Sequence, residues 1–375
     1  MKKTANKTVF VGLSGGVDSG VAAALLQNQG FDVVGVFIRT WHPDFLECNE
    51  EEERRDAMRV AAHLDIPFLI FDLEDVYKRE VADYMISEYK AGRTPNPDVM
   101  CNKEVKFGAF LKKSLKMGAD FVATGHYAKV KNHKISFAFL HPAGGTFRGQ
   151  KSYDSLLLKG KDVSKDQSYF LWTLRQEQLS KILFPVGHLK KTEVRTLAKK
   201  FKLPVAKKKD SQGICFLGAI DLKEFLKHYI KEKKSKVVNE KGKIIGWHMG
   251  AVFHTLGERH GFTVTKKSPN DGPYYVVAKD LKKNILIVSQ NSTYSHSKVL
   301  TNIRIENTNW IFLQPKADKI YTAQVRYHGD FLPCTIICAK SNLAQVIFQR
   351  SVMVASGQSV VVYDKDVCLG GGVVK

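Results

Sequence analysis

The apolar positions in the first third of the chain follow two alternating patterns. Short runs rich in β-branched and aromatic residues are typical of strands, and longer segments with apolar residues at helical spacing are typical of helices. The strand-like runs are residues 8–13, 32–38, 68–73 and 121–124, and the helix-like segments are residues 19–29, 50–64, 76–89 and 103–117. This order indicates a parallel sheet covered by helices on both faces. Such sheets bind ligands at the carboxyl ends of their strands, so we expect the loops after Leu13, Ile38 and Thr124 to converge.

The pattern changes beyond residue 131. A turn-forming segment at residues 141–145 indicates a hairpin, and helical spacing returns in three later segments. These helical segments are residues 167–182, 191–201 and 221–233. The remaining β runs are residues 242–246, 274–279, 285–289, 323–328, 346–348 and 360–363. We therefore expect an α/β chain: a Rossmann-like parallel-sheet domain at residues 1–220, a small β-rich central domain at 221–295 and a C-terminal β-barrel at 296–375.

The charge balance adds a partner to this picture. The chain has 58 Lys and Arg residues against 37 Asp and Glu residues, a formal net charge of +21. Such an excess attracts polyanions. Solubility alone does not explain it, because acidic side chains would solubilise a surface at least as well. Nucleic acid is therefore the expected partner. No run approaches the roughly 18 apolar residues that a membrane span needs. The short start leaves no room for a signal peptide, so we expect no membrane contact and a cytoplasmic location.

The cysteines are scattered along the chain. They are Cys48, Cys101, Cys215, Cys334, Cys338 and Cys368. No Cys-x-x-Cys pair occurs among them, so neither a structural zinc site nor an iron-sulfur cluster is expected.

The sharpest local motif is the segment Leu-Ser-Gly-Gly-Val-Asp-Ser at residues 13–19, between the first strand and the first helix. Its glycines let the backbone approach an anion, and the following helix presents N–H groups and a positive dipole end. No Gly-Lys-Ser/Thr follows, so this is not the kinase-like phosphate loop. It resembles the pyrophosphate loop of ATP enzymes that adenylate their substrate and release pyrophosphate. Asp18 would then help to hold Mg²⁺ against the phosphates.

Two cysteines have surroundings that favour a thiolate. Cys101 lies near the expected start of a helix beside Lys103, and Asp98 could transfer a proton. Cys215 lies in a glycine-flanked segment after six basic residues between positions 199 and 209. On residue types alone, a buried and inert Cys101 is as good an interpretation as a catalytic one.

Motifs spread over nearly the whole chain give a resemblance to a known family. They are residues 14–19, 96–107, 123–128, 165–170, 213–216, 326–327 and 369–372. In this order they resemble the tRNA-specific 2-thiouridylases. The resemblance implies an enzyme whose first domain binds an adenine nucleotide and which uses ATP and Mg²⁺ to place sulfur at position 2 of the wobble uridine of tRNA.

The same resemblance implies roles for individual residues. Cys215 is expected to carry persulfide sulfur from an outside donor protein, Cys101 to be the nucleophile that releases it and then forms a transient disulfide with Cys215, and Asp98 to be the acid/base. The expected ATP-binding residues are Gly12, Leu13, Ser14, Gly15, Gly16, Val17, Asp18, Ser19, Ile38 and Gly125. The residues expected to line the target-base pocket are Asn96, Pro97 and Asp98. The expected tRNA contacts are His126, Lys165, Asp166, Gln167, Arg326, Tyr327 and Gln358.

Two other classes of protein share part of this pattern. Another adenylating ligase with a pyrophosphate loop, such as an argininosuccinate-synthase-like enzyme or a tRNA lysidine synthetase, would need no cysteine pair. A non-catalytic RNA-binding protein that keeps the fold would need neither Asp18 nor the cysteines. The intact loop together with Cys101 and Cys215 favours the thiolase.

Overall fold

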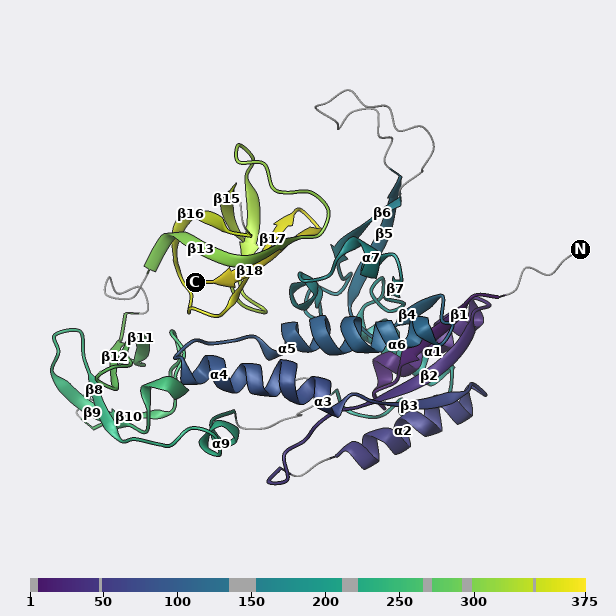
Figure 1. Cartoon of the computed structure of the whole chain (residues 1–375), viewed down its shortest axis with the longest axis horizontal. Helices are drawn as coiled ribbons and strands as arrows, with labels where there is room; N and C mark the ends of the chain where they lie inside the picture. The colour runs from purple at the N-terminus through teal and green to yellow at the C-terminus, as the bar shows by residue number, and fades with distance from the viewer. Residues whose placement is uncertain are drawn as a thin grey trace, which may run out of the picture.

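The computed structural model describes residues 6–46, 49–134, 153–210, 222–265, 272–291, 299–339 and 342–375. Its strands form three separate sheets (Figure 1). The two sheets of the later part of the chain lie to one side of the first, with two consecutive helical runs extending toward them from the first sheet.

The first sheet has five parallel strands in the order β3-β2-β1-β4-β7. They are β1 (Thr8–Gly12), β2 (Asp32–Arg39), β3 (Phe68–Asp72), β4 (Phe121–Ala123) and β7 (Ile182–Leu183). Along β1, Val9 and Val11 join one hydrophobic core and Phe10 joins another, because successive side chains of a strand point to opposite faces. The predicted parallel sheet with two covered faces is confirmed.

Helices pack on both faces of this sheet. Those that share the core of Val9 and Val11 are α1 (Val17–Asn28), α2 (Glu50–His63) and α8 (Lys191–Lys200). The other face is covered by two helical runs, each with a π-helical middle. The first run comprises α3 (Glu74–Tyr77), η1 (Lys78–Asp83) and α4 (Tyr84–Lys90), and the second comprises α5 (Pro97–Met100), η2 (Cys101–Phe110) and α6 (Leu111–Lys116).

The prediction of one helix over residues 167–182 is wrong. The segment holds a 3₁₀ turn, η4 (Ser168–Leu171), and a single turn of helix, α7 (Gln176–Leu179), before β7. Its side chains bond outward to the C-terminal barrel: the Tyr169 hydroxyl donates to the Ser359 carbonyl over 2.9 Å and Trp172 Nε1 to Ser359 Oγ over 3.1 Å. These long-range bonds compete with a continuous helix and are invisible to local periodicity. The next predicted helix after α8 is also shorter, as α9 (Leu222–Lys227).

The central part of the chain forms a small five-stranded sheet in the order β10-β9-β8-β12-β11. Its strands are β8 (Ser235–Val238), β9 (Ile244–His248), β10 (Phe262–Val264), β11 (Tyr275–Asp280) and β12 (Ile285–Ser289), with a short 3₁₀ turn, η5 (Ala251–Phe253). A small core of its own includes Val237, Val276 and Leu286. The sheet confirms the expected β-rich central unit.

The last part of the chain is a closed barrel of six strands. They are β13 (Val299–Trp310), β14 (Tyr321–Gln324), β15 (Leu332–Cys338), β16 (Ala344–Met353), β17 (Ser359–Asp364) and β18 (Val367–Val374). β13 pairs with both β16 and β18, which closes the ring. The predicted C-terminal barrel is confirmed.

A hairpin of the N-terminal part adds to this barrel sheet. β5 (Ala128–Lys134) and β6 (Tyr153–Lys159) pair with each other antiparallel, and β6 also pairs with β18 through Leu157 and Leu158. The turn predicted at residues 141–145 lies outside the described residues. No helix within the described part of the chain is long and apolar enough to cross a bilayer.

Candidate functional site

The glycine-rich loop lies at the carboxyl end of β1 and leads into α1. Gly15 has a φ of +69°, and a Cβ there would lie 2.3 Å from the Glu53 carbonyl oxygen, so this position requires glycine. Ser19 Oγ accepts from Ser14 N over 3.2 Å and donates to the Gly16 carbonyl over 3.1 Å, which fixes the turn. Gly16 caps α1 without a side chain, so the positive end of the helix faces the loop. This arrangement suits a phosphate group.

Two further predicted ATP-binding residues lie on the strands that flank β1. Ile38 is near the end of β2 and is buried. Gly125 follows β4, and a Cβ there would lie 2.7 Å from Ser19 N and 2.8 Å from the Asp18 carbonyl carbon. The loops after β1, β2 and β4 therefore converge as predicted. The contacts of these residues with ATP stay predictions.

Asp18 is engaged by two side chains that sequence reasoning missed. Lys191 Nζ, at the start of α8, lies 2.7 and 2.8 Å from the two carboxylate oxygens of Asp18. The Tyr127 hydroxyl donates to Asp18 Oδ1 over 2.8 Å, and burial together with the Asp18 charge raises the pKa of Tyr127 above its usual range. The Asp18 carboxylate thus has a cation beside it before any Mg²⁺ is considered.

Lys191 also binds a second carboxylate. Its Nζ lies 2.9 Å from Asp210 Oδ1, and Lys165 Nζ lies 3.1 Å from Asp210 Oδ2. Arg195 pairs with the same carboxylate. Partial burial raises the pKa of Asp210, but the bonds and charges of these three cations outweigh it and hold the pKa well below its usual value. Asp210 is therefore a carboxylate at neutral pH, with a cation on each side.

This cluster links the glycine-rich loop to Asp210, the last described residue before the segment with the second cysteine. Asp210 directly precedes residues 211–221, and Cys215 is five positions further on but lies outside the described residues. Lys165, a predicted tRNA contact, is held by Asp210 instead of standing alone at the surface. Nothing in the sequence spacing points to a pair of residues 173 positions apart, as Lys191 and Asp18 are.

The first cysteine lies in the helical run that begins at Pro97. Asn96 caps α5, its side-chain oxygen accepting from Val99 N over 3.1 Å, and Pro97 occupies the first helical position. Cys101 is the fifth residue of the run, beyond the first turn where the helix dipole acts most strongly. Its exposure is 0%, and it belongs to the core under the sheet. Residue types alone did not decide whether Cys101 is buried, and in the structure it is.

A buried amide beside Cys101 is a candidate that the sequence did not single out. Asn102 is 3% exposed, and its Nδ2 donates to the Asp98 carbonyl over 2.9 Å. Its side-chain oxygen has no hydrogen-bond partner in the described part of the chain. An unsatisfied buried acceptor is costly, so this oxygen is available to an N–H donor that enters the site. Asp98 itself is half-buried at the first turn of α5.

Three predicted tRNA contacts face inward. His126 is 6% exposed and hydrogen-bonds with Thr124 Oγ1 at 2.7 Å, and burial lowers its pKa well below the usual range. Gln167 Oε1 accepts from Tyr127 N over 3.0 Å. Asp166 accepts from Gly160 N over 2.9 Å and from Ser168. Gln167 and Asp166 thus hold backbone N–H groups in place, and His126 binds a neighbouring hydroxyl. The contacts of all three with tRNA stay predictions.

The remaining predicted tRNA contacts belong to the barrel. Arg326 is exposed, and Tyr327 packs against Phe170 with ring centroids 4.3 Å apart. Burial raises the pKa of Tyr327 to about 12, with smaller effects from the charges of Asp166 and Asp98. Gln358 is half-buried in the loop before β17. Next to it, Ser356 O accepts from Thr94 N over 2.8 Å, so this barrel loop packs near the start of α5.

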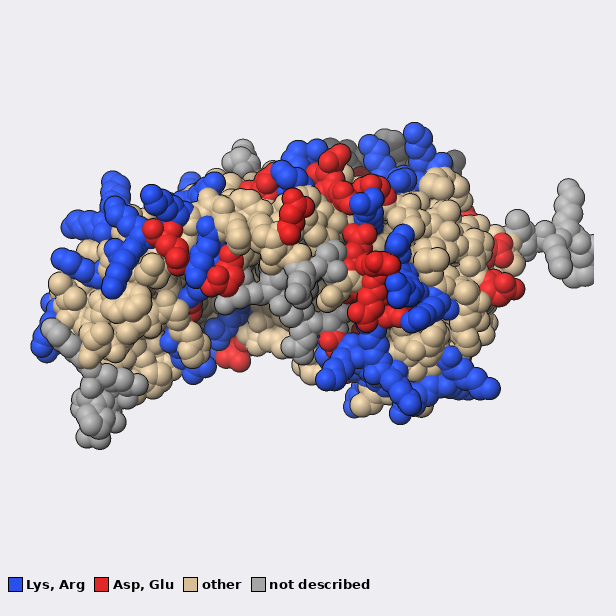
Figure 2. Space-filling view, turned by 90° about the horizontal axis from the view of Figure 1, so that it is seen from below, with Lys and Arg blue, Asp and Glu red and all other residues tan. Residues whose placement is uncertain are grey.

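The surface charge is unevenly distributed. Figure 2 shows Lys and Arg side chains over the end of the molecule that carries β8, β9 and β10, and a cluster of acidic side chains nearer the middle. The exposed cations of that basic end are Lys231, Lys233, Lys234, Lys236, Lys241 and Lys243. Within the described residues, no group of three or more His, Cys, Asp or Glu side chains could hold a metal ion.

The fold defines an α/β protein whose parallel-sheet domain is followed by two β units. Three family models match successive parts of the chain: the tRNA methyl transferase HUP domain at residues 7–219, the tRNA methyl transferase PRC-barrel domain at 223–290 and the aminomethyltransferase beta-barrel domain at 300–374.

Full-length relatives narrow the class. The chain is 41% identical over 372 residues to the tRNA-specific 2-thiouridylase of Nitrosomonas europaea, covering 98% of this chain and 97% of the relative. It is 43% identical over 375 residues to that of Listeria monocytogenes, covering 98% and 94%. The chain belongs to the tRNA-specific 2-thiouridylase family, a family of sulfurtransferases. The chain is also similar to a solved 4-thiouridine synthetase–RNA complex with bound ATP, with 20% identity and a TM-score of 0.34. The match covers 59% of this chain and 50% of the chain in that structure.

Proposed function

We propose that the protein catalyses the ATP-dependent 2-thiolation of the wobble uridine of tRNA. The observation that carries this proposal is the shared ammonium of Lys191. It joins Asp18, in the glycine-rich loop, to Asp210, five residues before Cys215. An adenylating loop and a sulfur-carrying cysteine are needed at one base, and this ion pair holds the loop near Asp210, the last described residue before the segment with Cys215. The relatives that share nearly the full length of the chain are named tRNA-specific 2-thiouridylases.

The first half of the reaction would activate the base. Residues 12–19 would hold the phosphates of ATP, with the adenine between the loops that contain Ile38 and Gly125. Mg²⁺ would arrive with the nucleotide, because it is commonly bound by substrate phosphates and one or two carboxylates, here that of Asp18. The uridine C2 oxygen would attack the α-phosphate and release pyrophosphate, which converts a poor leaving group into AMP. Asn96, Pro97 and Asp98 would surround the flipped base.

The second half would transfer the sulfur. A donor protein would load Cys215 as a persulfide, and the Cys101 thiolate would attack its inner sulfur. That step forms the Cys101–Cys215 disulfide and releases hydrosulfide, which attacks C2 as AMP leaves. Asp98 would act as the acid/base residue that takes up and returns a proton during the transfer. An external thiol reductant would then supply two electrons to reopen the disulfide.

The burial of Cys101 adds a requirement to this mechanism. A side chain with 0% exposure is closed to a reductant in solution, and the Cys101–Cys215 disulfide must be reopened by one. We therefore propose that binding of tRNA, ATP or both exposes Cys101. Residues 1–220 would bind ATP and carry out the chemistry, residues 221–295 would connect the parts, and residues 296–375 would contact tRNA.

The test is mass spectrometry of nucleosides from unmodified tRNA incubated with the protein, ATP, Mg²⁺ and a persulfide source. Wild type should give ATP-dependent 2-thiouridine, and Cys215→Ser should give none. Cys334→Ser is the matched control, because Cys334 is buried in the barrel core and should leave the product unchanged. AMP and pyrophosphate without thiolated base, in wild type and Cys215→Ser alike, would mean an adenylating ligase of another kind.

A further inference from the structure

The linker at residues 91–96, between α4 and α5, contacts both of the later β units. Figure 1 shows it at the end of the two helical runs that lies toward those units. It leads directly into Asn96, Pro97 and Asp98 and then, within one more turn, into Cys101. The proposed mechanism uses those residues and assigns no role to the linker before them. Contacts that hold the linker therefore also hold the segment that would carry out the chemistry.

The central unit contacts the linker from one side. Lys279 Nζ, on β11, donates to the Gly92 carbonyl over 3.0 Å. Thr94 Oγ1 lies 3.2 Å from Thr255 Oγ1, in the loop after η5, and the two hydroxyls are hydrogen-bonded. Thr94 is 6% exposed, so this bond is shielded from water. Gly92 has a φ of +74°, and a Cβ there would collide with the Leu281 side chain, which shows how closely the two parts fit.

The barrel contacts the same linker from another side. Thr94 N donates to the Ser356 carbonyl, in the loop before β17, over 2.8 Å. The next residue, Gly357, has a φ of +91°, and a Cβ there would lie 3.0 Å from both the nitrogen and the carbonyl oxygen of Thr94. Thr94 therefore has its backbone bonded to the barrel and its side chain bonded to the central unit.

A further contact joins the barrel to the start of α5. The Tyr169 hydroxyl donates to the Ser359 carbonyl, at the start of β17, over 2.9 Å and is hydrogen-bonded to Asn96. Tyr169 and Cys101 belong to one hydrophobic core, in which η4 packs against α5 and η2. The barrel thus holds the catalytic segment at its beginning, through Thr94, and along its side, through Tyr169.

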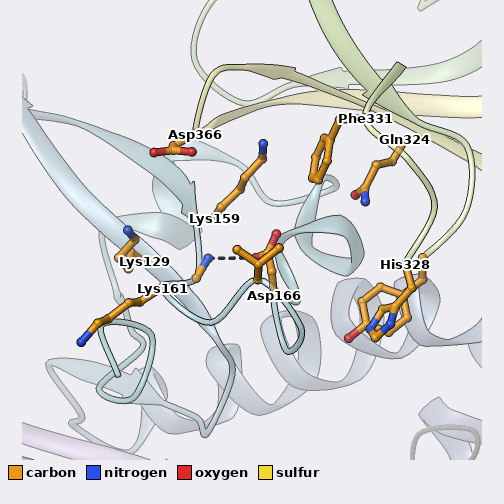
Figure 3. A pocket seen from close by; sticks show the side chains of 11 residues that line it. Lys129, Lys159, Lys161, Asp166, Gln324, His328, Phe331 and Asp366 are labelled. Atoms are coloured by element: carbon orange, nitrogen blue, oxygen red, sulfur yellow. Dashed lines mark hydrogen bonds between the residues drawn. The ribbon is translucent and has the colours of Figure 1, made fainter. Parts of the chain in front are cut away.

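The boundary between the barrel and the N-terminal part also contains a cavity of about 250 Å³ (Figure 3). Lys159 and Asp166 line it from the N-terminal part, and Gln324 and Phe331 line it from the barrel. A cavity leaves room for its two walls to move relative to each other, whereas closely packed walls resist such movement. A small displacement of the barrel would therefore act first on the hydrogen bonds of Thr94 and Tyr169.

We propose that Thr94 is a positioning residue of the reaction: it connects the start of α5 to the central unit and the barrel, and this connection keeps Cys101 covered. Displacement of either β unit when tRNA binds would break the bonds of Thr94, release α5 and expose the thiol. The role of Cys101 as nucleophile rests on the proposed function. The dependence of its burial on Thr94 does not.

The test is the rate at which iodoacetamide modifies Cys101 in the resting protein, without tRNA or ATP, followed by peptide mass spectrometry. If opening breaks the bond between Thr94 and Thr255, Thr94→Val should raise this rate about fivefold, the factor that corresponds to one ordinary hydrogen bond. Thr94→Ser keeps the hydroxyl and should stay within about twofold of wild type.

The same bond can be removed from the central unit. Thr255→Val should accelerate modification of Cys101 as much as Thr94→Val does, and the double variant should be about as fast as either single variant, because all three lack one and the same bond. If Thr94→Val is poorly folded, Thr255→Val carries the test.

Ile336→Val is the matched control. Ile336 is 0% exposed in the barrel core, and its truncation lowers the stability of the protein about as much as the loss of one hydrogen bond. It should leave the modification rate of Cys101 unchanged. Equal acceleration by Ile336→Val would mean that the rate follows overall stability, and an unchanged rate in Thr94→Val and Thr255→Val would mean that their bond does not cover Cys101. Either result would overturn the proposal. Faster modification in Thr94→Val, with no 2-thiouridine formed by wild type, would refute the proposed function and leave the positioning role standing.

Discussion

The Lys191 ammonium lies 2.7 and 2.8 Å from the two carboxylate oxygens of Asp18. The side chain of Lys191 is 14% exposed, so the contact is largely shielded from water. A divalent cation at Asp18 and an ammonium at this distance repel each other strongly. The proposed binding of Mg·ATP at Asp18 therefore requires that Lys191 move toward Asp210 or toward the phosphates.

Removal of Lys191 should make the site bind Mg²⁺ without nucleotide. In Lys191→Met, two carboxylates face each other with one cation fewer, so Mg²⁺ alone should raise the Tm by about 2 °C more than in wild type. The measurement is thermal unfolding with and without Mg²⁺. Lys200→Met, at the exposed end of the same helix, should respond like wild type. Identical Mg²⁺ responses of wild type and Lys191→Met would contradict this reading of the pair.

Gly125→Ala should shift the glycine-rich loop. The new Cβ would lie within 2.8 Å of Asp18 and Ser19, so the backbone must shift, at an expected cost of about 1–3 kcal/mol in the free energy of unfolding. ATP affinity, measured by calorimetric titration, should fall with it. Gly272→Ala is the control, since a Cβ there would meet no atom of the described residues within 4 Å. Unchanged urea midpoints for both variants would show that the loop can shift to accept the new Cβ with no loss in the free energy of unfolding.

Lys279 should make stability depend on pH in the alkaline range. Burial lowers its pKa to about 8, against the smaller opposing effect of Glu258, and its Nζ donates to the carbonyls of Gly92 and His254. Between pH 8 and about 10.5 the unfolded chain holds this proton more tightly, so the contribution to stability grows with rising pH and is lost as pH falls through 8.

The comparison of wild type with Lys279→Met isolates this effect. From pH 7.5 to 10, urea unfolding should show wild type gaining about 2 kcal/mol relative to the variant. Lys282 is an exposed neighbour, so the free energy of unfolding of Lys282→Met should differ from that of wild type by the same amount at every pH. A flat difference for Lys279→Met would mean that its ammonium stays charged in the folded state throughout.

Alkylation should report the exposure of Cys101 that the proposed mechanism requires. In the resting protein, iodoacetamide should modify Cys101 at least about tenfold more slowly than in the urea-unfolded chain, because reaction awaits local opening. Addition of tRNA and ATP should accelerate it. Cys334, buried in the barrel with its pKa raised to about 12 by burial, should not respond to either. Fast labelling of Cys101 in the resting protein would remove the need for a rearrangement.

Much of the architecture could be predicted from local patterns. A short apolar run that includes Val9, Phe10 and Val11 predicts a buried strand, and the glycines at positions 15 and 16 predict a loop that can bind an anion. The strand and the loop could be predicted because each depends on residues that are neighbours in sequence. The same reasoning placed the carboxyl ends of β1, β2 and β4 together.

What could not be predicted depends on contacts far apart in the chain. The Asp18–Lys191–Asp210 cluster joins three segments that come together only through the whole fold. The sequence of a lysine-rich stretch is the same whether its lysines form ion pairs or face the solvent. The inward orientation of His126 is of the same kind, since a polar residue after a strand fits a surface or a core position. The broken helix near Tyr169 arises because the barrel supplies better partners than the helix would.

The pairing of β6 with β18 sets an order of events during synthesis. β18 is the final strand, and Val367 and Cys368 are its residues that pair with Leu158 and Leu157. Chains fold from the N-terminus as they leave the ribosome, so the edge of β6 has no partner during most of translation. An open strand edge is prone to pair with other chains. A chain that ends before residue 367 would therefore keep a strand edge that is prone to pair with other chains, even though its first parallel sheet is already complete.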